Sequence, residues 1–317
     1  MVALQEAREQ GSRRPGRAPA RWILPLALSA LPWLWFAVRD LGAAMDAVAV
    51  GLPLGVGIAA LGVLAWAIGS RRSRFAIVAL SLAAFDAAAV VAPRMPQASP
   101  APIDRFRLVS SNTFDANPSP ARAATVLLAR RADVLVTVET RVTVARPLAQ
   151  AYANAHAQRA GGLDVFSTWP LRPLPAVPGL PSGSVMRVEV LRPGGPFVLY
   201  AVHLANPLHD VSFSAQAATA RRLMSAAERE NLPVVLAGDF NMSDRLSSYR
   251  ALDGSFRDAM RASFAPSTYD HGPWVLLQLR IDHVFTSTSM CAASPEVFGV
   301  PGSDHDALEV ELGACRA

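Results

Sequence analysis

The chain has 317 residues, of which 51% are hydrophobic and 17% charged, and this balance is too apolar for an ordinary soluble protein of its length. The net charge of +5 suggests a nucleic-acid partner, but residues 1–94 hold ten Arg and five acidic residues, whereas residues 95–317 hold 20 of each. The whole excess belongs to the N-terminal part, so charge gives no indication that the rest of the chain binds nucleic acid.

Three apolar stretches follow a basic tail at residues 1–21. They lie near residues 22–38, 47–68 and 75–92, and each approaches the roughly 20 residues with which a helix spans a bilayer. We therefore expect three transmembrane helices in residues 22–92. A cleaved signal peptide is the alternative for the first stretch, but two more apolar stretches follow at once and no clear small-residue cleavage site does.

The distribution of Arg predicts the orientation of these spans. The tail and the loop at residues 71–74 (RRSR) are basic, whereas the other short loop has Arg39 balanced by Asp40. The positive-inside rule places both basic segments in the cytoplasm, and three spans then place the rest of the chain outside it. We expect a multi-pass protein of the cell membrane with an extracytoplasmic domain.

Residues 93–104 are rich in Pro and predict a semi-rigid linker, which leaves residues 105–317 as one domain with a substantial core. The stretch 169–183 carries five prolines and is typical of a surface loop. Strand-like runs lie at 106–111, 133–138, 163–167, 184–191, 197–203, 233–238, 281–286 and 307–312, and helix-like segments lie at 118–131, 142–153 and 215–231.

Polar residues capable of chemistry stand at the ends of many of these strand-like runs. A single such residue is usually a helix or strand cap, or a solvated terminus. Strand ends on one rim of a sheet converge in space, however, so a repeated pattern favours an active site. The residues are Asn112, Glu139, His203, Asp239 with Asn241, Asp282, and Asp304 with His305.

The order and spacing of these segments resemble the endonuclease/exonuclease/phosphatase superfamily, the DNase I-like proteins. The most specific motifs are GDFN (238–241), SDH (303–305) and RIDHVF (280–285), and the resemblance covers roughly residues 105–313. It implies an α/β fold, a four-layer sandwich of two packed mixed β-sheets flanked by helices, here preceded by about three transmembrane helices.

The resemblance also implies a role for each polar residue. Asp239 would orient or deprotonate an attacking water, and Asn241 would donate to a phosphate oxygen. Glu139 would be the main ligand of Mg²⁺, or of Mn²⁺ in its place, with Asn112 and Asp304 completing the metal's surroundings.

Two histidines complete the set. His305 would contact the phosphate or act as general acid/base, held by Asp282. His203 stands where DNase I-like and sphingomyelinase-like members carry His and exonuclease III-like members carry Tyr, which weakens the interpretation as an abasic-site repair enzyme.

These inferences predict a membrane-tethered, metal-dependent hydrolase that cleaves a phosphoester outside the cytoplasm. The neutral charge of the domain and its tether favour a lipid headgroup or a small phosphoester over nucleic acid. An extracytoplasmic nuclease and a non-catalytic binding module on the same fold are the alternatives. Lost catalytic residues would signal the second of these, and none of the set is missing. The pattern does not name the substrate or the oligomeric state.

The only two cysteines are Cys291 and Cys315, and both lie in the domain expected outside the cytoplasm, where an oxidising compartment permits a bridge. In the related fold, the strands that they follow belong to the same half of the sandwich. We therefore expect a disulfide that closes a loop containing Asp304 and His305.

Overall fold

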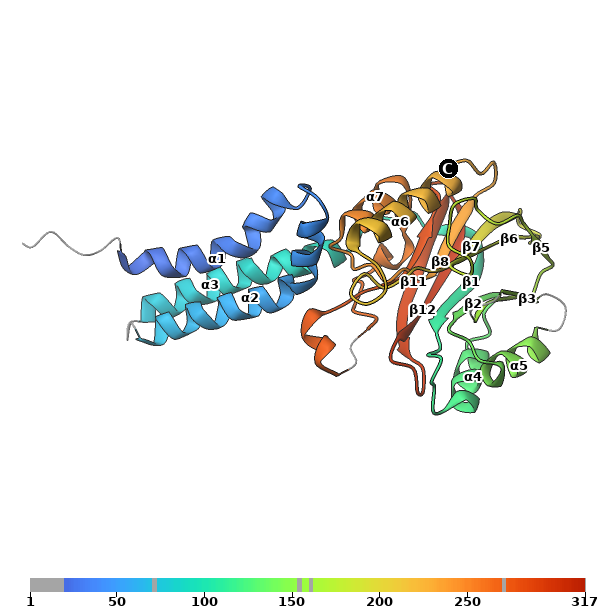
Figure 1. Cartoon of the computed structure of the whole chain (residues 1–317), viewed down its shortest axis with the longest axis horizontal. Helices are drawn as coiled ribbons and strands as arrows, with labels where there is room; N and C mark the ends of the chain where they lie inside the picture. Colours follow the sequence, from blue (N-terminus) through green and yellow to red (C-terminus); the bar gives the residue numbers. More distant parts are fainter. Residues whose placement is uncertain (1–19, 70–72, 153–155, 160–161, 270–271, 317) are drawn as a thin grey trace, which may run out of the picture. The chain divides into compact units, whose positions relative to one another are not determined.

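The computed structural model describes residues 20–69, 73–152, 156–159, 162–269 and 272–316. Its N-terminal helices are α1 (Ala20–Val38), α2 (Ala43–Gly69) and α3 (Ser73–Val91) (Figure 1). Within these ranges, α2 and α3 are the two helices long and apolar enough to cross a membrane. The described residues thus support two of the three expected spans, and α1 (Ala20–Val38) is not among the candidate spans. The basic residues before Ala20 and in the loop at 71–72 lie outside the described ranges.

Contacts divide the chain into two compact units. One holds the residues up to Ala37 together with Leu54–Val90, and the other holds Val38–Pro53 and everything from Val91 onward. The start of α2 therefore belongs to the same unit as the domain that follows α3.

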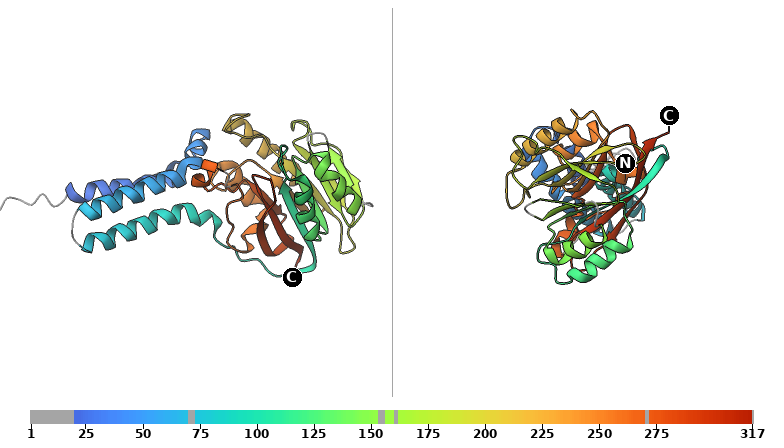
Figure 2. Two further views of the ribbon diagram at one scale, coloured as in Figure 1. Left: turned by 90° about the horizontal axis from the view of Figure 1, so that it is seen from below. Right: turned by 90° about the vertical axis from the view of Figure 1, so that its right-hand side faces the viewer.

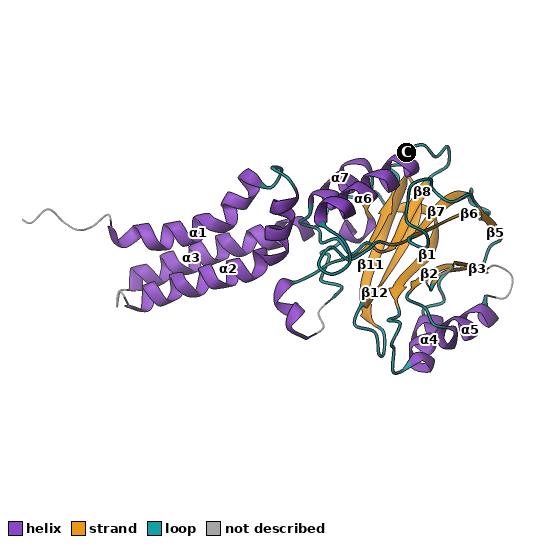
Figure 3. Cartoon of the chain, in the orientation of Figure 1, coloured by secondary structure: helices purple, strands orange, loops and turns teal. Residues whose placement is uncertain are grey.

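The second unit contains two six-stranded mixed sheets. The first has the order β11-β12-β1-β2-β4-β3, and the second has the order β5-β6-β7-β8-β10-β9. The strands are drawn in orange in Figure 3. The strands are β1 (Pro102–Asn112), β2 (Val134–Val138), β3 (His156–Arg159), β4 (Leu163–Ser167), β5 (Leu171–Pro173), β6 (Val185–Val190), β7 (Phe197–His203), β8 (Val234–Asp239), β9 (Arg257–Asp258), β10 (Asp282–Thr286), β11 (Met290–Gly299) and β12 (Asp306–Cys315).

Apolar side chains of both sheets interleave to form a central core that includes Leu108, Val136, Leu199 and Val284. Helices α4 (Pro120–Ala129) and α5 (Val142–Ala151) cover the outer face of the first sheet, and α6 (Phe213–Ala227) and α7 (Ser247–Ser255) cover that of the second (Figure 2). Short 3₁₀ turns lie at Ala92–Arg94, Ala259–Ala262 and Gly272–Leu277. The predicted four-layer sandwich is confirmed.

Several elements differ from the sequence-based expectation, including the short strands β3 and β9, which no strand-like run predicted. The Pro-rich stretch contains β5, an edge strand, where Pro costs no hydrogen bond to a neighbour. Strand β11 was not predicted because a register shift between Ala293 and Glu296 interrupts its alternation. Helix α7 was missed because it is short and contains Gly254. Strand β1 begins at Pro102, inside the predicted linker.

The strand directions bring the polar ends together. β1 runs parallel to β2, and β7 runs parallel to β8, so the carboxyl ends of each pair lie side by side. β10 is antiparallel to β8, which sets its first residue, Asp282, opposite Asp239. β12 is antiparallel to β1, so the residues just before Asp306 lie near the end of β1.

Candidate active site

A cavity of about 380 Å³ lies where these strand ends meet. Asn112 and Asp282 are buried beside it, within hydrogen-bond distance of residues that line it. The other six predicted site residues all line it: Glu139, His203, Asp239, Asn241, Asp304 and His305. The structure thus brings together all eight residues that the motifs singled out.

The Gly-Asp-Phe-Asn segment makes a sharp turn at the end of β8. Gly238 has a φ of 143°, and a Cβ atom there would lie 2.0 Å from the backbone oxygen of Val202, so only glycine fits. Asn241 has a φ of 49°, and its backbone N–H donates to Asp239 Oδ1 at 2.7 Å. Phe240 is fully buried. One local structure therefore closes the strand and directs Asp239 and Asn241 into the cavity.

The side chain of Asn241 is already engaged. Its Nδ2 donates to the backbone oxygen of Leu204 at 2.9 Å and more weakly to Asp239 Oδ2 at 3.3 Å. A phosphate oxygen would replace Asp239 Oδ2 as the acceptor at the least cost, because this hydrogen bond is the longer of the two.

Glu139 follows β2 directly and adopts a left-handed φ of 53°, which is uncommon for this residue type and is a feature of functional sites. Asn112 Nδ2 donates to Glu139 Oε1 at 3.0 Å and to Asp239 Oδ2 at 3.1 Å. The amide oxygen of Asn112 accepts from the backbone N–H of Phe114. Asn112 therefore bridges the two carboxylates through its nitrogen rather than presenting its oxygen to them.

His305 is held by Asp282, because its Nδ1 donates to Asp282 Oδ2 at 2.8 Å. Its Nε2 lies 3.8 Å from Asp239 Oδ2. Burial disfavours the imidazolium, but the carboxylates of Asp282 and Asp239 outweigh it and raise the pKa of His305 to about 10. The pKa of Asp239 is raised mainly by burial and secondly by the negative charge of Asp282.

His203 connects the two acidic sides of the cavity. It pairs with Asp239 in the parallel register of β7 and β8, and its Nε2 lies 3.4 Å from Glu139 Oε1. Ligand atoms of Glu139, His203 and Asp239 all lie within 4.8 Å of one another, as do those of Asp239, Asp282 and His305.

The donor set fits a hard divalent cation. Glu139 and Asp239 supply carboxylate oxygens, which Mg²⁺ and Mn²⁺ prefer. Asp304 lines the same cavity, and its Oδ1 is buried without a hydrogen-bond partner among the described residues. A buried carboxylate oxygen without a partner is costly, and a bound cation would supply one.

The motifs did not reveal an apolar side of the cavity. Tyr269 packs edge-on against the ring of His305, with 4.8 Å between ring centroids. A loop tyrosine in no periodic pattern carries no signal in the sequence. The apolar lining also includes Val50, Leu246, Leu279 and Ile281. Val50 lies in an apolar stretch far from every motif, so only its packing reveals it.

Buried ion pairs lie beside the Gly-Asp-Phe-Asn turn. Asp244 accepts from Arg94 Nε at 3.1 Å, from Arg280 Nε at 3.4 Å and from Arg245 Nη1 at 3.4 Å. Burial alone would raise the pKa of Asp244, but the three guanidinium groups lower it to about 2. This network holds the segment that follows Asn241 in one position.

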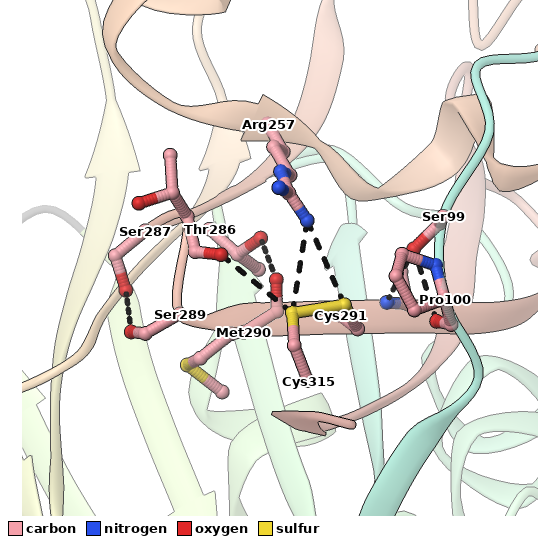
Figure 4. Close-up of a disulfide and its surroundings, with 11 residues drawn as sticks. Ser99, Pro100, Arg257, Thr286, Ser287, Ser289, Met290, Cys291 and Cys315 are labelled. Carbon is pink, nitrogen blue, oxygen red and sulfur yellow. Dashed lines mark hydrogen bonds between the residues drawn. A yellow bond between two sulfur atoms is a disulfide. The ribbon is translucent and has the colours of Figure 1, made fainter. Parts of the chain in front are cut away.

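The expected disulfide between Cys291 and Cys315 is present, with 4.9 Å between the Cα atoms (Figure 4). Arg257 Nη1 lies 3.6 Å from each sulfur. The bridge joins the start of β11 to the end of β12 and closes the loop that contains Asp304 and His305.

Two packed mixed sheets with acidic and histidine side chains gathered at one rim define a DNase I-like protein. A sequence model described as "Endonuclease/Exonuclease/phosphatase family" matches residues 108–305, well over half of the chain. This chain belongs to that family, whose name covers enzymes that act on phosphoester bonds.

Solved structures show the same fold. An endonuclease/exonuclease/phosphatase from Beutenbergia cavernae is 20% identical with a TM-score of 0.52, over 67% of this chain and 72% of that one. An endonuclease/exonuclease/phosphatase from Bacteroides vulgatus is 16% identical with a TM-score of 0.54, over 67% and 100%. A humanized D. rerio TDP2 is 14% identical with a TM-score of 0.55, over 66% and 99%. No curated protein sequence matches the chain.

Proposed function

We propose that the chain is a membrane-tethered phosphoester hydrolase that uses a divalent cation, Mg²⁺ or alternatively Mn²⁺, and acts outside the cytoplasm. The observation that carries the proposal is the meeting of Glu139, Asp239 and His305 in one cavity of a family-matched domain. These three side chains supply an acidic cation site, a base and a proton donor within a few ångströms.

The reaction follows from this placement. Asp239 accepts a proton from a water molecule while the oxygen of that water bonds to phosphorus. The ester P–O bond on the opposite side of the phosphorus breaks. His305, oriented by Asp282, gives a proton through Nε2 to the departing oxygen. Asn241 donates to a non-bridging phosphate oxygen. The products are an alcohol and a phosphate with one ester bond fewer.

Glu139 and Asp304 would hold the cation, and His203 would fix the Glu139 carboxylate. Asn112, expected as a further ligand, would instead position Glu139 and Asp239 through Nδ2, because its amide oxygen accepts from the backbone N–H of Phe114. When bound, a divalent cation supplies positive charge to the phosphoryl oxygens and so lowers the energy of the transition state.

Three observations support the topology. Asp46 at the start of α2 accepts hydrogen bonds from Ser247, so the segment before the α2 span and the domain after α3 belong on the same side of a membrane. The basic loop between α2 and α3 favours the cytoplasm for the opposite side. The Cys291–Cys315 bridge fits an oxidising compartment.

A hydrolysis panel with the full chain in detergent tests the proposal, because residues 38–53 belong to the same unit as the domain. The substrates are DNA, RNA, sphingomyelin, phosphoinositides and nucleotides, each with Mg²⁺, with Mn²⁺ and with EDTA. We expect cation-dependent release of a phosphorylated headgroup or phosphate. Preferred cleavage of DNA or RNA would instead support the nuclease alternative. Binding without turnover of any substrate would support the non-catalytic one.

A further inference from the structure

The apolar wall of the catalytic cavity is completed by the beginning of α2. Val50 is only 8% exposed and packs in the same apolar cluster as Leu246, Leu279 and Ile281. All four side chains line the cavity that holds Glu139 and His305. One part of the cavity can therefore bind an anionic group. Another part offers an apolar surface to the substituent that this anionic group carries.

This wall is fixed in place by buried polar contacts. The two carboxylate oxygens of Asp46 accept from the backbone N–H and the hydroxyl of Ser247 at 2.7 and 2.6 Å. Arg245 Nε donates to the backbone oxygen of Ala49 at 3.0 Å. The residues that precede Val50 are thus held by the turn that follows the Gly-Asp-Phe-Asn segment.

The chain leads directly from this wall into a hydrophobic span. Val50 lies within the candidate membrane-spanning helix Ala44–Gly69, four positions before Leu54, where the other unit begins. Four residues reach at most about 14 Å even when fully extended. The hydrocarbon wall of the cavity consequently lies close to the point at which α2 would enter a bilayer.

The charges of the lining argue against a polyanion. Among the described residues that line the cavity, the ionisable side chains are Asp, Glu, His and Tyr, and neither Arg nor Lys is among them. A nucleic-acid groove needs several cationic side chains along the backbone, whereas one phosphate needs only the cation site.

We propose that the cavity takes a phosphoester lipid from the adjoining bilayer, with the phosphate at Glu139, Asp239 and His305 and the first carbons of the chain-bearing group against Val50, Leu246 and Leu279. This inference rests on the proposed hydrolase activity and names its substrate class. Val50 acts as a specificity residue supplied by the membrane anchor.

A homologous series of alkyl 4-nitrophenyl phosphates, from methyl to octyl, tests the wall with the full chain in amphipol. We expect kcat/KM to rise with chain length by up to about fourfold per methylene until the wall is covered. The 4-nitrophenyl ester of thymidine 5′-phosphate serves as the nucleotide probe. Failure to hydrolyse any diester, together with no turnover in the substrate panel above, would refute the hydrolase proposal itself. Hydrolysis that is independent of chain length, or fastest with the nucleotide probe, would refute only the lipid inference.

Val50→Asn and Val48→Asn form a matched pair, because Val48 lies on the same helix and is 50% exposed. Val50→Asn should lower the octyl-to-methyl ratio of kcat/KM about tenfold, and the smaller change Val50→Ala should lower it less. Val48→Asn should leave the ratio and both rates unchanged. If Val50→Ala slows the methyl and octyl esters by the same factor, Val50 does not recognise the chain and the inference fails.

The source of the substrate is tested with octadecyl 4-nitrophenyl phosphate. Enzyme in nanodiscs that contain this ester should hydrolyse it faster than enzyme in plain nanodiscs mixed with ester-loaded liposomes. Equal initial rates would exclude the enzyme's own bilayer as the source.

Discussion

Glu139 is held in left-handed backbone geometry, with its carboxylate bonded to Asn112 and close to His203. If Glu139 is the principal cation ligand, Glu139→Gln keeps the shape of the side chain but removes its charge. The concentration of Mg²⁺ that gives half-maximal activity should then rise at least about tenfold, while the melting temperature changes little. Metal titrations of the two proteins make the measurement. Superimposable curves would remove Glu139 from the cation site.

The His305–Asp282 pair allows a second test at the scale of single residues. His305→Ala should lower kcat by about 10²–10⁴-fold, the usual contribution of a general acid/base. Asp282→Asn should cause a smaller loss, because the imidazole stays but loses the carboxylate that orients it. Circular dichroism provides the folding control. Wild-type kcat in both variants would show that the pair has no part in catalysis.

At the scale of elements, α7 begins without a cap from its own sequence, since its N-cap residue is Leu246. Asp46 fills this role from α2 by accepting from the backbone N–H and the hydroxyl of Ser247, the first residue of α7. Asp46→Ala should destabilise the protein by about 2–3 kcal/mol, because two hydrogen bonds to a buried charge are lost. Thermal melting measures the effect. Asp40→Ala, which removes an exposed partner of Arg250, is the control and should change the melting temperature very little.

His283 on β10 makes stability depend on pH. The pKa of His283 is lowered to about 4, mainly by burial and secondly by the positive charge of Arg280. The negative charges of Asp258 and Asp244 act in the opposite direction but are outweighed. The folded protein therefore binds fewer protons than the unfolded chain between about pH 6.5 and pH 4. Stability should fall as the pH drops through this range, by roughly 3 kcal/mol at most.

His283→Gln isolates this contribution, because the amide can still donate to the backbone oxygen of Met242 as the imidazole Nε2 does. Melting temperatures of both proteins from pH 7 to pH 4.5 give the comparison. The difference between them should narrow or reverse on acidification. A constant difference would mean that His283 does not titrate in this range.

At the scale of the whole molecule, the disulfide ties the last strand to β11 and encloses the loop of Asp304 and His305. Replacing Cys291 and Cys315 together by Ser should cost about 3 kcal/mol of stability on the chain-entropy model. Non-reducing peptide mapping of protein isolated without reductant from its native source tests the bridge itself. Free thiols at both positions would contradict it and would also count against an extracytoplasmic domain.

Local chemistry made the eight polar site residues predictable. Gly238, Asp239 and Asn241 form a turn whose geometry is set within four residues, and each of the other polar residues stands at or next to a strand end. Since parallel strands end at a common rim, their convergence follows from strand order alone. The missed elements are those where local signals conflict, as at the register shift in β11 and at Gly254 in α7.

The sequence by itself determined the strand-like and helix-like segments, the polar residues at their ends and the apolar stretches, because periodicity and motif spacing are local properties of the chain. The sandwich was implied by the resemblance of these motifs to a known family. Only the tertiary structure decided that α2 begins inside the unit that holds the two sheets, that Asp46 caps α7 and that Val50 lines the cavity. These contacts join residues about 200 positions apart. They depend on shape complementarity and on the pairing of buried polar groups, and neither leaves a periodic pattern in the sequence.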